Sequence, residues 1–282
     1  MEYKRKTLVE GLVFGEAPRW HEGRLWFSDM HAESVMSVGL DGNCEKVVDV
    51  PNRPSGLGWL PDGRLLIVSM LDRRLLRLED GQLVEHADLS HIATWHCNDM
   101  VVDVNGNAYV GNFGYDLEVE APVEVEAKLA LVTSDGEVKP VADGLIFPNG
   151  SVITPDGKTL IVAETFGHKL SAFDIQSAGS LSNKRIYADL SPNHLDGICL
   201  DAEGGIWVAE PISGECIRVL EGGEITHRFS TDRGCFACML GGPDRKTLFL
   251  MTADGFIREE VLAARSGRIE MVEVDVPGVG LP

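Results

Sequence analysis

Apolar and polar positions alternate in short segments along the whole chain, and no stretch shows a sustained helical period. The commonest unit is a short apolar stretch, a turn rich in Asp and Gly, and a second apolar stretch, as in NGSVITPDGKTLIV at 149–162. Aliphatic and aromatic residues suit buried strands, and PDG, NG or EG turns supply the positive φ of a tight hairpin. The pattern therefore predicts an all-β fold built from hairpins.

This strand–turn–strand unit recurs six times. Its copies occupy 16–27, 55–68, 98–110, 149–162, 196–208 and 238–250. They follow one another at intervals of roughly 40 to 50 residues, a spacing typical of repeat architectures. Weaker strand segments fill the intervals, which makes about four antiparallel strands per repeat, the content of a propeller blade. A β-sandwich also has many short strands but does not repeat one unit six times. We predict a single six-bladed β-propeller domain over residues 1–282.

A propeller also has to close its ring of blades. The segment 267–276 is predicted to be an outer strand of the sixth blade, and residues 6–14 are expected to pair into the same blade.

The first strand of each blade lines the central channel of a propeller. The first residue of each copy should then lie near the channel mouth, at Glu16, Ser55, Asn98, Asn149, Asp196 and Cys238. A single Asn or Asp there would most simply bond to nearby backbone. Four carboxylate or amide side chains at one topological position (Glu16, Asn98, Asn149 and Asp196) favour a site for a hard divalent cation, which prefers oxygen ligands.

Other residues are expected around this mouth. The second strand of each unit returns to it, so the following loops should surround the site. His96 and His194 each precede a channel residue by two positions and share its strand face, where they border the site or bond to nearby carbonyls. The loop 114–128 is the longest, and it is either a specificity loop or a solvated acidic insertion.

Net charge and hydrophobicity exclude several kinds of binding partner. A net charge of −19 repels phosphate backbones and argues against nucleic-acid binding. No run of 18 apolar residues is present, so no membrane span is expected. The N-terminal residues lack the apolar segment of a signal peptide, which predicts a cytoplasmic protein with reduced cysteines. The single CxxC, Cys235 to Cys238, has no second pair to complete a structural zinc site.

Several short motifs resemble one known family. They are Gly15-Glu16-Ala17-Pro18-Arg19-Trp20, Cys97-Asn98-Asp99, Phe147-Pro148-Asn149-Gly150, Leu195-Asp196-Gly197 and Gly241-Gly242-Pro243-Asp244. Together they resemble the senescence-marker/gluconolactonase/luciferin-regenerating enzyme (regucalcin-like) family, over nearly the whole chain. The resemblance implies a six-bladed propeller with one divalent metal in its channel.

Carried over residue by residue, the resemblance implies that Glu16, Asn149 and Asp196 are the metal ligands. It implies that Asn98 touches the substrate or completes the coordination, and that Asp196 is the general base. Sugar-lactone hydrolases of the family often have Arg two residues before the Asn98 position. This chain has His96 there, so sugar-lactone specificity is not implied.

The sequence thus predicts metal-dependent hydrolysis of a lactone, with Asp196 as base and with Asn98 and His96 positioning a small-molecule substrate. The all-oxygen ligands favour Ca²⁺, with Mg²⁺, Mn²⁺, Zn²⁺ and Fe²⁺ as alternatives. No Gly-x-Ser-x-Gly motif is present, which argues against a serine hydrolase. The alternatives are an esterase or organophosphate hydrolase on the same site, a calcium-binding regulator or interaction propeller without enzymatic activity, and a metal-free strictosidine-synthase-like enzyme. The oligomeric state stays open.

Overall fold

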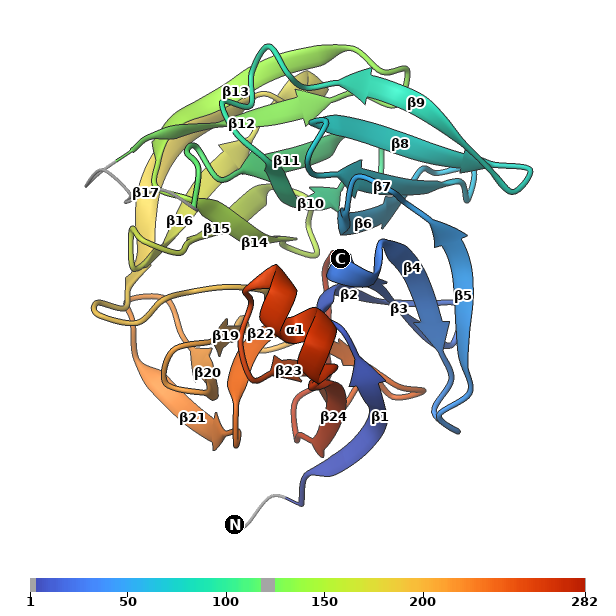
Figure 1. Ribbon diagram of the computed structural model, residues 1–282. Helices are drawn as coiled ribbons and strands as arrows, with labels where there is room; N and C mark the ends of the chain where they lie inside the picture. Colours follow the sequence, from blue (N-terminus) through green and yellow to red (C-terminus); the bar gives the residue numbers. More distant parts are fainter. Residues whose placement is uncertain (1–3, 118–124, 282) are drawn as a thin grey trace.

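Six four-stranded antiparallel sheets surround a central channel in the computed structural model, which describes residues 4–117 and 125–281 (Figure 1). The first three blades are β2(Gly15–His21)–β3(Arg24–Asp29)–β4(Ser34–Val38)–β5(Cys44–Asp49), β6(Pro54–Trp59)–β7(Leu65–Ser69)–β8(Arg74–Glu79)–β9(Gln82–Asp88) and β10(Cys97–Val102)–β11(Ala108–Asn112)–β12(Ala127–Val132)–β13(Val138–Leu145). The others are β14(Pro148–Ile153)–β15(Thr159–Glu164)–β16(Lys169–Ile175)–β17(Leu181–Asp189), β18(Ile198–Leu200)–β19(Ile206–Glu210)–β20(Glu215–Val219)–β21(Ile225–Ser230) and β22(Gly234–Gly241)–β23(Thr247–Ala253)–β24(Gly267–Glu273)–β1(Lys6–Leu12). The predicted six-bladed, all-β propeller is confirmed.

The N-terminal strand closes the ring. β1 pairs antiparallel with β24 and forms the outermost strand of blade six, beside strands from the other end of the chain (Figure 1). The predicted pairing of residues 6–14 into this blade is confirmed. Segment 267–276 contributes the third strand, and β1 lies outside it.

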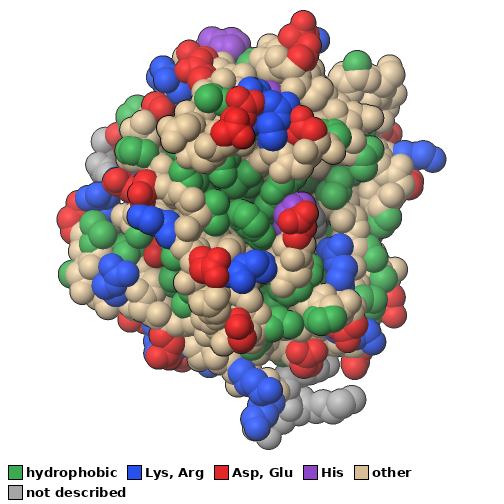
Figure 2. All heavy atoms as spheres, turned by 90° about the vertical axis from the view of Figure 1, so that its right-hand side faces the viewer, with side chains coloured by type: hydrophobic (Ala, Val, Ile, Leu, Met, Phe, Trp, Pro, Cys, Tyr) green, Lys and Arg blue, Asp and Glu red, His purple; other side chains and the backbone are tan. Residues whose placement is uncertain are grey.

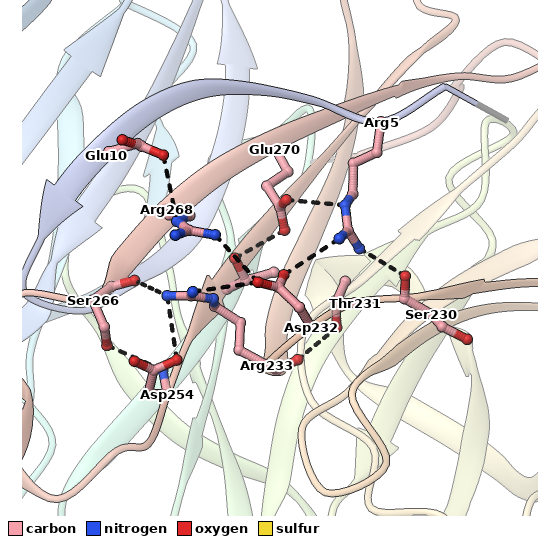
Figure 3. A network of polar contacts seen from close by, with 11 residues as sticks. Arg5, Glu10, Ser230, Thr231, Asp232, Arg233, Asp254, Ser266, Arg268 and Glu270 are labelled. Atoms are coloured by element: carbon pink, nitrogen blue, oxygen red, sulfur yellow. Dashed lines mark hydrogen bonds and ion pairs between the residues drawn. The ribbon is translucent and has the colours of Figure 1, made fainter.

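An ion-pair network ties β1 to blades five and six (Figure 3). Arg5 Nε lies 3.0 Å from Glu270 Oε1, and Arg5 also donates to Ser230 O at 2.7 Å. The Glu270 side chain is only 4% exposed, and Thr252 Oγ1 donates to its other oxygen at 3.1 Å. A buried carboxylate needs such partners, so this network holds the closing strand in place.

Replacing Arg5 tests this closure. Arg5→Met removes the cation beside a buried carboxylate, and we expect the free energy of unfolding to fall by about 1–2 kcal/mol in denaturant titrations. Arg268→Met is the matched control, because Arg268 pairs with the more exposed Glu10 and Asp232 and its loss should cost under about 0.5 kcal/mol. Equal losses for the two variants would contradict this account of Arg5.

Glycines let the inner strands meet around the channel. A Cβ on Gly56, Gly150 or Gly197 would come within 2.5, 2.6 and 2.6 Å of Met100 N, Ile198 N and Ala237 Cβ in the next blade. Each of these glycines directly follows one of the predicted channel residues. The Asn-Gly and Asp-Gly pairs of the motifs therefore reflect close approach of neighbouring backbones.

The C-terminal tail runs across the end of the channel opposite the mouth. It forms backbone hydrogen bonds from Leu281 to Ile153 in blade four and from Val279 to Leu200 in blade five. At the mouth, the 3₁₀-helix η1 (Met30–Ala32) follows β3, and the helix α1 (Arg258–Ala264) packs against it. The mouth is thus the end of the channel to which the loops after each second strand return. The other 3₁₀-helix, η2 (Ser177–Gly179), lies between β16 and β17.

The outer side of blades one and two carries charges of both signs around apolar side chains (Figure 2). Between these blades, Leu57, Ile67 and Val35 form a buried cluster, against which Trp26 and Trp59 pack partly buried. Among the described residues, no helix is long and apolar enough to cross a membrane.

Candidate functional site

Pairing registers show which residues are equivalent at the channel mouth. In blade four, Asn149 lies four residues before Ile153, which pairs with Leu160. The same offset from the corresponding pair gives Glu16, Ser55, Asn98 and Asp196 in four other blades, as predicted. In blade six it gives Phe236, because Leu240 pairs with Leu248.

The prediction that Cys238 faces the channel is therefore wrong. The turn of blade six is two residues longer than those of blades three and five, and this displaces an alignment based on the whole unit by two positions. Cys238 is 1% exposed, and its Sγ lies 3.8 Å from Cys199 Sγ and 3.4 Å from Trp207 O, between blades five and six. All five cysteines other than Cys44 are buried, and all six are free thiols.

Two carboxylates, Glu16 and Asp196, come together in the channel mouth. Burial raises the pKa of Glu16 well above its ordinary value, and the charges of Asp196 and Asp99 raise it further. Burial likewise raises the pKa of Asp196 to about 8, assisted by Asp99 and Glu210 and opposed by a hydrogen bond from Asn149. Asn149 of blade four thus bonds to Asp196 of blade five, and the charge of Asp196 acts on Glu16 of blade one.

A third carboxylate, Asp99, was not predicted as part of this group. Arg19 Nη2 lies 2.6 Å from Asp99 Oδ1, and both side chains are buried. Arg19 also donates to Leu57 O, Pro18 O and Met100 O, so its hydrogen-bonding capacity is largely taken by these groups. One feature of the sequence could have indicated it: Asp99 directly follows the channel residue of its blade, a position at which three other blades have glycine.

The amide of Asn149 is oriented by Thr165. Thr165 Oγ1 donates its single proton to Leu195 O at 2.7 Å. It can then only accept from Asn149, whose Nδ2 lies 3.1 Å away. The nitrogen of the amide therefore faces Thr165, and the oxygen Oδ1 is turned away from it, as a metal ligand would require.

Carboxylates at the ends of the second strands anchor the segments that carry the site. Asp29 Oδ1 accepts from Phe14 N at 2.8 Å, Glu164 from Ile146 N at 2.7 Å, and Glu210 from His194 N at 2.8 Å. These amides lie two or three residues before Glu16, Asn149 and Asp196 respectively. Because all three bonds are charge-assisted, they fix the entry of each inner strand.

The predicted substrate-binding residues, Asn98 and His96, lie at the mouth end of blade three. Asn98 is buried, and its Nδ2 lies 3.4 Å from Pro148 O in the next blade. His96 is half-buried, its ring stacks on Trp95 with centroids 5.0 Å apart, and burial lowers its pKa. His194 Nδ1 lies 3.7 Å from Glu210 Oε1. Residues 118–124 of the loop 114–128, predicted to be either a specificity loop or a solvated acidic insertion, lie outside the described residues.

Glu16 and Asp196 could hold a hard cation only if the amide oxygen of Asn149 also binds it. Within residues 4–117 and 125–281, no three His, Cys, Asp or Glu side chains form a group that could hold a metal ion. The candidate set has two carboxylates, and the third ligand would be the oriented oxygen of Asn149. Oxygen-only donors of this kind suit Ca²⁺ better than softer metals.

Sequence comparison identifies relatives over most of the chain. Regucalcin from Xenopus laevis is 28% identical over 258 residues, covering 88% of this chain and 85% of the relative. Regucalcin from Sus scrofa is 30% identical over 278 residues, with coverage of 88% and 85%.

Solved structures share the fold. A calcium-binding protein, regucalcin, from Agrobacterium tumefaciens superposes with a TM-score of 0.83 at 21% identity, covering 99% of this chain and 97% of that one. A gluconolactonase from Xanthomonas campestris gives 0.77 at 21% identity, with coverage of 98% and 90%. The family described as SMP-30/gluconolactonase/LRE-like region matches residues 14–254. This chain belongs to the SMP-30/gluconolactonase/LRE-like family.

Proposed function

We propose that this protein is a metal-dependent lactonase acting on a small-molecule lactone. The observation that supports the proposal is the pair of buried carboxylates, Glu16 and Asp196: burial raises the pKa of both, the charge of Asp196 raises that of Glu16 further, and the nearby Arg19 is engaged by Asp99. A divalent cation between them would relieve this repulsion. A net charge of −19 further disfavours nucleic acid as a partner.

The residues divide the work as follows. Glu16, Asn149 and Asp196 would hold the cation, Ca²⁺ by the chemistry of the donors. When bound, the cation supplies Lewis acidity that polarises the lactone carbonyl and stabilises the oxyanion. Asn98 would hold the substrate beside it through its amide.

Asp196 would act as the general base. A nearby cation favours its ionised form, so its carboxylate can accept a proton from the attacking water. The water oxygen bonds to the carbonyl carbon, and the bond between that carbon and the ring oxygen then breaks. The ring oxygen takes the proton back, and a hydroxy acid leaves.

Metal removal tests the proposal. Protein dialysed against EDTA should lose lactone hydrolysis in a proton-release assay and unfold at a lower temperature. Ca²⁺ added at about 100 times its Kd should restore activity and stabilise the fold by about 2.7 kcal/mol, because only the native state offers the site. Mg²⁺, Mn²⁺ and Zn²⁺ are parallel additions, with sugar lactones, aliphatic lactones and aryl esters as substrates.

The outcomes separate the alternatives. Full hydrolysis in metal-free protein would refute metal dependence. Calcium-dependent stabilisation without hydrolysis of any lactone or ester would instead support a calcium-binding regulator, in keeping with the calcium-binding protein from Agrobacterium tumefaciens that shares this fold. Hydrolysis of aryl or phosphate esters alone would support an esterase.

A further inference from the structure

Eight aromatic and imidazole rings form one continuous arc on the mouth face of blades three to five. From blade three to blade five they are Trp95, His96, Phe113, Tyr115, Phe147, Phe166, His194 and His168. Each ring contacts another, with centroid separations between 4.4 Å, for Phe113 and Phe147, and 6.2 Å, for Tyr115 and Phe166. The arc is therefore a single surface built from five separate segments of the chain.

The arc begins directly at the candidate site. Phe147 lies two residues before Asn149, and His194 lies two residues before Asp196. Thr165, which orients the Asn149 amide, is followed by Phe166. His96 O accepts a hydrogen bond from Phe113 N, which joins the strand of Asn98 to the next loop. A ligand held at the oxygen cluster would thus lie against these rings.

Seven of the eight rings are at least partly exposed to solvent. Phe166 is 40% exposed, Phe147 is buried, and the other rings are half-buried. The Phe166 ring lies nearly perpendicular to those of Phe147 and His194, with interplanar angles of 83° and 80°. Such a half-open arrangement of ring faces and edges offers another flat ring both stacked and edge-to-face contacts.

We propose that this aromatic arc is a subsite for the flat, apolar part of the substrate, so that the preferred lactones are fused to or carry an aromatic ring. The proposal rests on the proposed lactonase function. The three phenylalanine rings in the middle of the arc, Phe113, Phe147 and Phe166, present only carbon, so this part of the arc offers no partner for the several hydroxyls of a sugar lactone. Unpaired hydroxyls would lose their hydrogen bonds to water, whereas an aromatic ring gains by burial.

The test compares two lactones that share a six-membered lactone ring. Dihydrocoumarin carries a fused aromatic ring, and δ-valerolactone carries none. Phe166→Ala should lower kcat/KM for dihydrocoumarin roughly 5- to 20-fold and leave that for δ-valerolactone within about twofold. Because the ratio is taken between variant and wild type for each substrate, the greater reactivity of the aryl ester cancels.

A matched control lies outside the arc, between β23 and α1. Phe256 is 51% exposed and belongs to blade six, outside the arc. Phe256→Ala should leave both kcat/KM values unchanged. Phe166→Leu retains apolar area without the ring and should recover only part of the loss for dihydrocoumarin. Equal losses on both lactones in Phe166→Ala, or a preference for glucono-δ-lactone that Phe166→Ala does not alter, would overturn the proposal.

A binding measurement separates this proposal from the function it rests on. Asp196→Asn protein, in which hydrolysis should be slowed by about 10²- to 10⁴-fold, is titrated calorimetrically with dihydrocoumarin, with and without Phe166→Ala. Binding weakened roughly 5- to 20-fold by Phe166→Ala supports the subsite even if the wild-type protein hydrolyses no lactone. Binding of equal strength in both proteins, or no binding, overturns it whatever the activity.

Discussion

Asp196→Asn should lower kcat/KM for lactone hydrolysis by about 10²- to 10⁴-fold, the usual contribution of a positioned general base. The amide retains the shape of the carboxylate but cannot accept the proton of the attacking water. The same change removes one of the three proposed ligands, so calcium affinity should fall as well. Steady-state kinetics and calorimetric Ca²⁺ titration measure the two effects separately.

Stability provides the internal check on this variant. In metal-free protein, Asp196→Asn replaces a buried carboxylate that raises the pKa of Glu16, so its unfolding temperature should equal or exceed that of the wild type. Asp156→Asn makes the same substitution in an exposed turn at the other end of the blades and should leave activity unchanged. An Asp196→Asn protein with kcat/KM within threefold of wild type would refute the assignment of Asp196 as base.

Arg19→Met should destabilise the metal-free protein by about 3–5 kcal/mol, the cost of leaving a buried charge without its partner. The substitution leaves the Asp99 carboxylate without its cationic partner, near Glu16 and Asp196. It also removes the donors to Leu57 O and Met100 O. Chemical denaturation measures the loss. We expect it to be the largest effect of any single arginine substitution considered for this chain.

Two comparisons isolate the charge from the packing. Arg64→Met removes a partly exposed arginine that also pairs with two carboxylates, Asp62 and Glu79, and should change stability far less. Combining Arg19→Met with Asp99→Leu removes both charges and should recover most of the loss, because the two residues interact directly. Wild-type stability in the single Arg19→Met variant would contradict this account.

The repeat made much of the site accessible from sequence. Glu16, Asn98, Asn149 and Asp196 share one place in a repeated unit, and the structure puts them at one place in the channel mouth. Phe236 was missed because the turn of blade six is two residues longer than those of blades three and five. An alignment of the units by sequence cannot detect those extra residues, whereas the pairing of Leu240 with Leu248 shows them directly.

Other features could not be predicted because they depend on contacts between distant segments. Asp99 and Arg19 are 80 positions apart in the chain, and nothing in either motif indicates that one binds the other. The orientation of Asn149 depends on Thr165 and on a carbonyl in the next blade. Neither kind of contact leaves a periodic signal in the sequence.

The sequence by itself determined the number of blades, the inner strand of each and five of the six channel positions. It could do so because strand alternation, turn chemistry and repetition are local properties that recur with every blade. Only the tertiary structure decided which charges are paired, which amide oxygen is free and which rings adjoin. These properties arise where loops of different blades meet at one end of the channel, after the chain has closed its ring through β1.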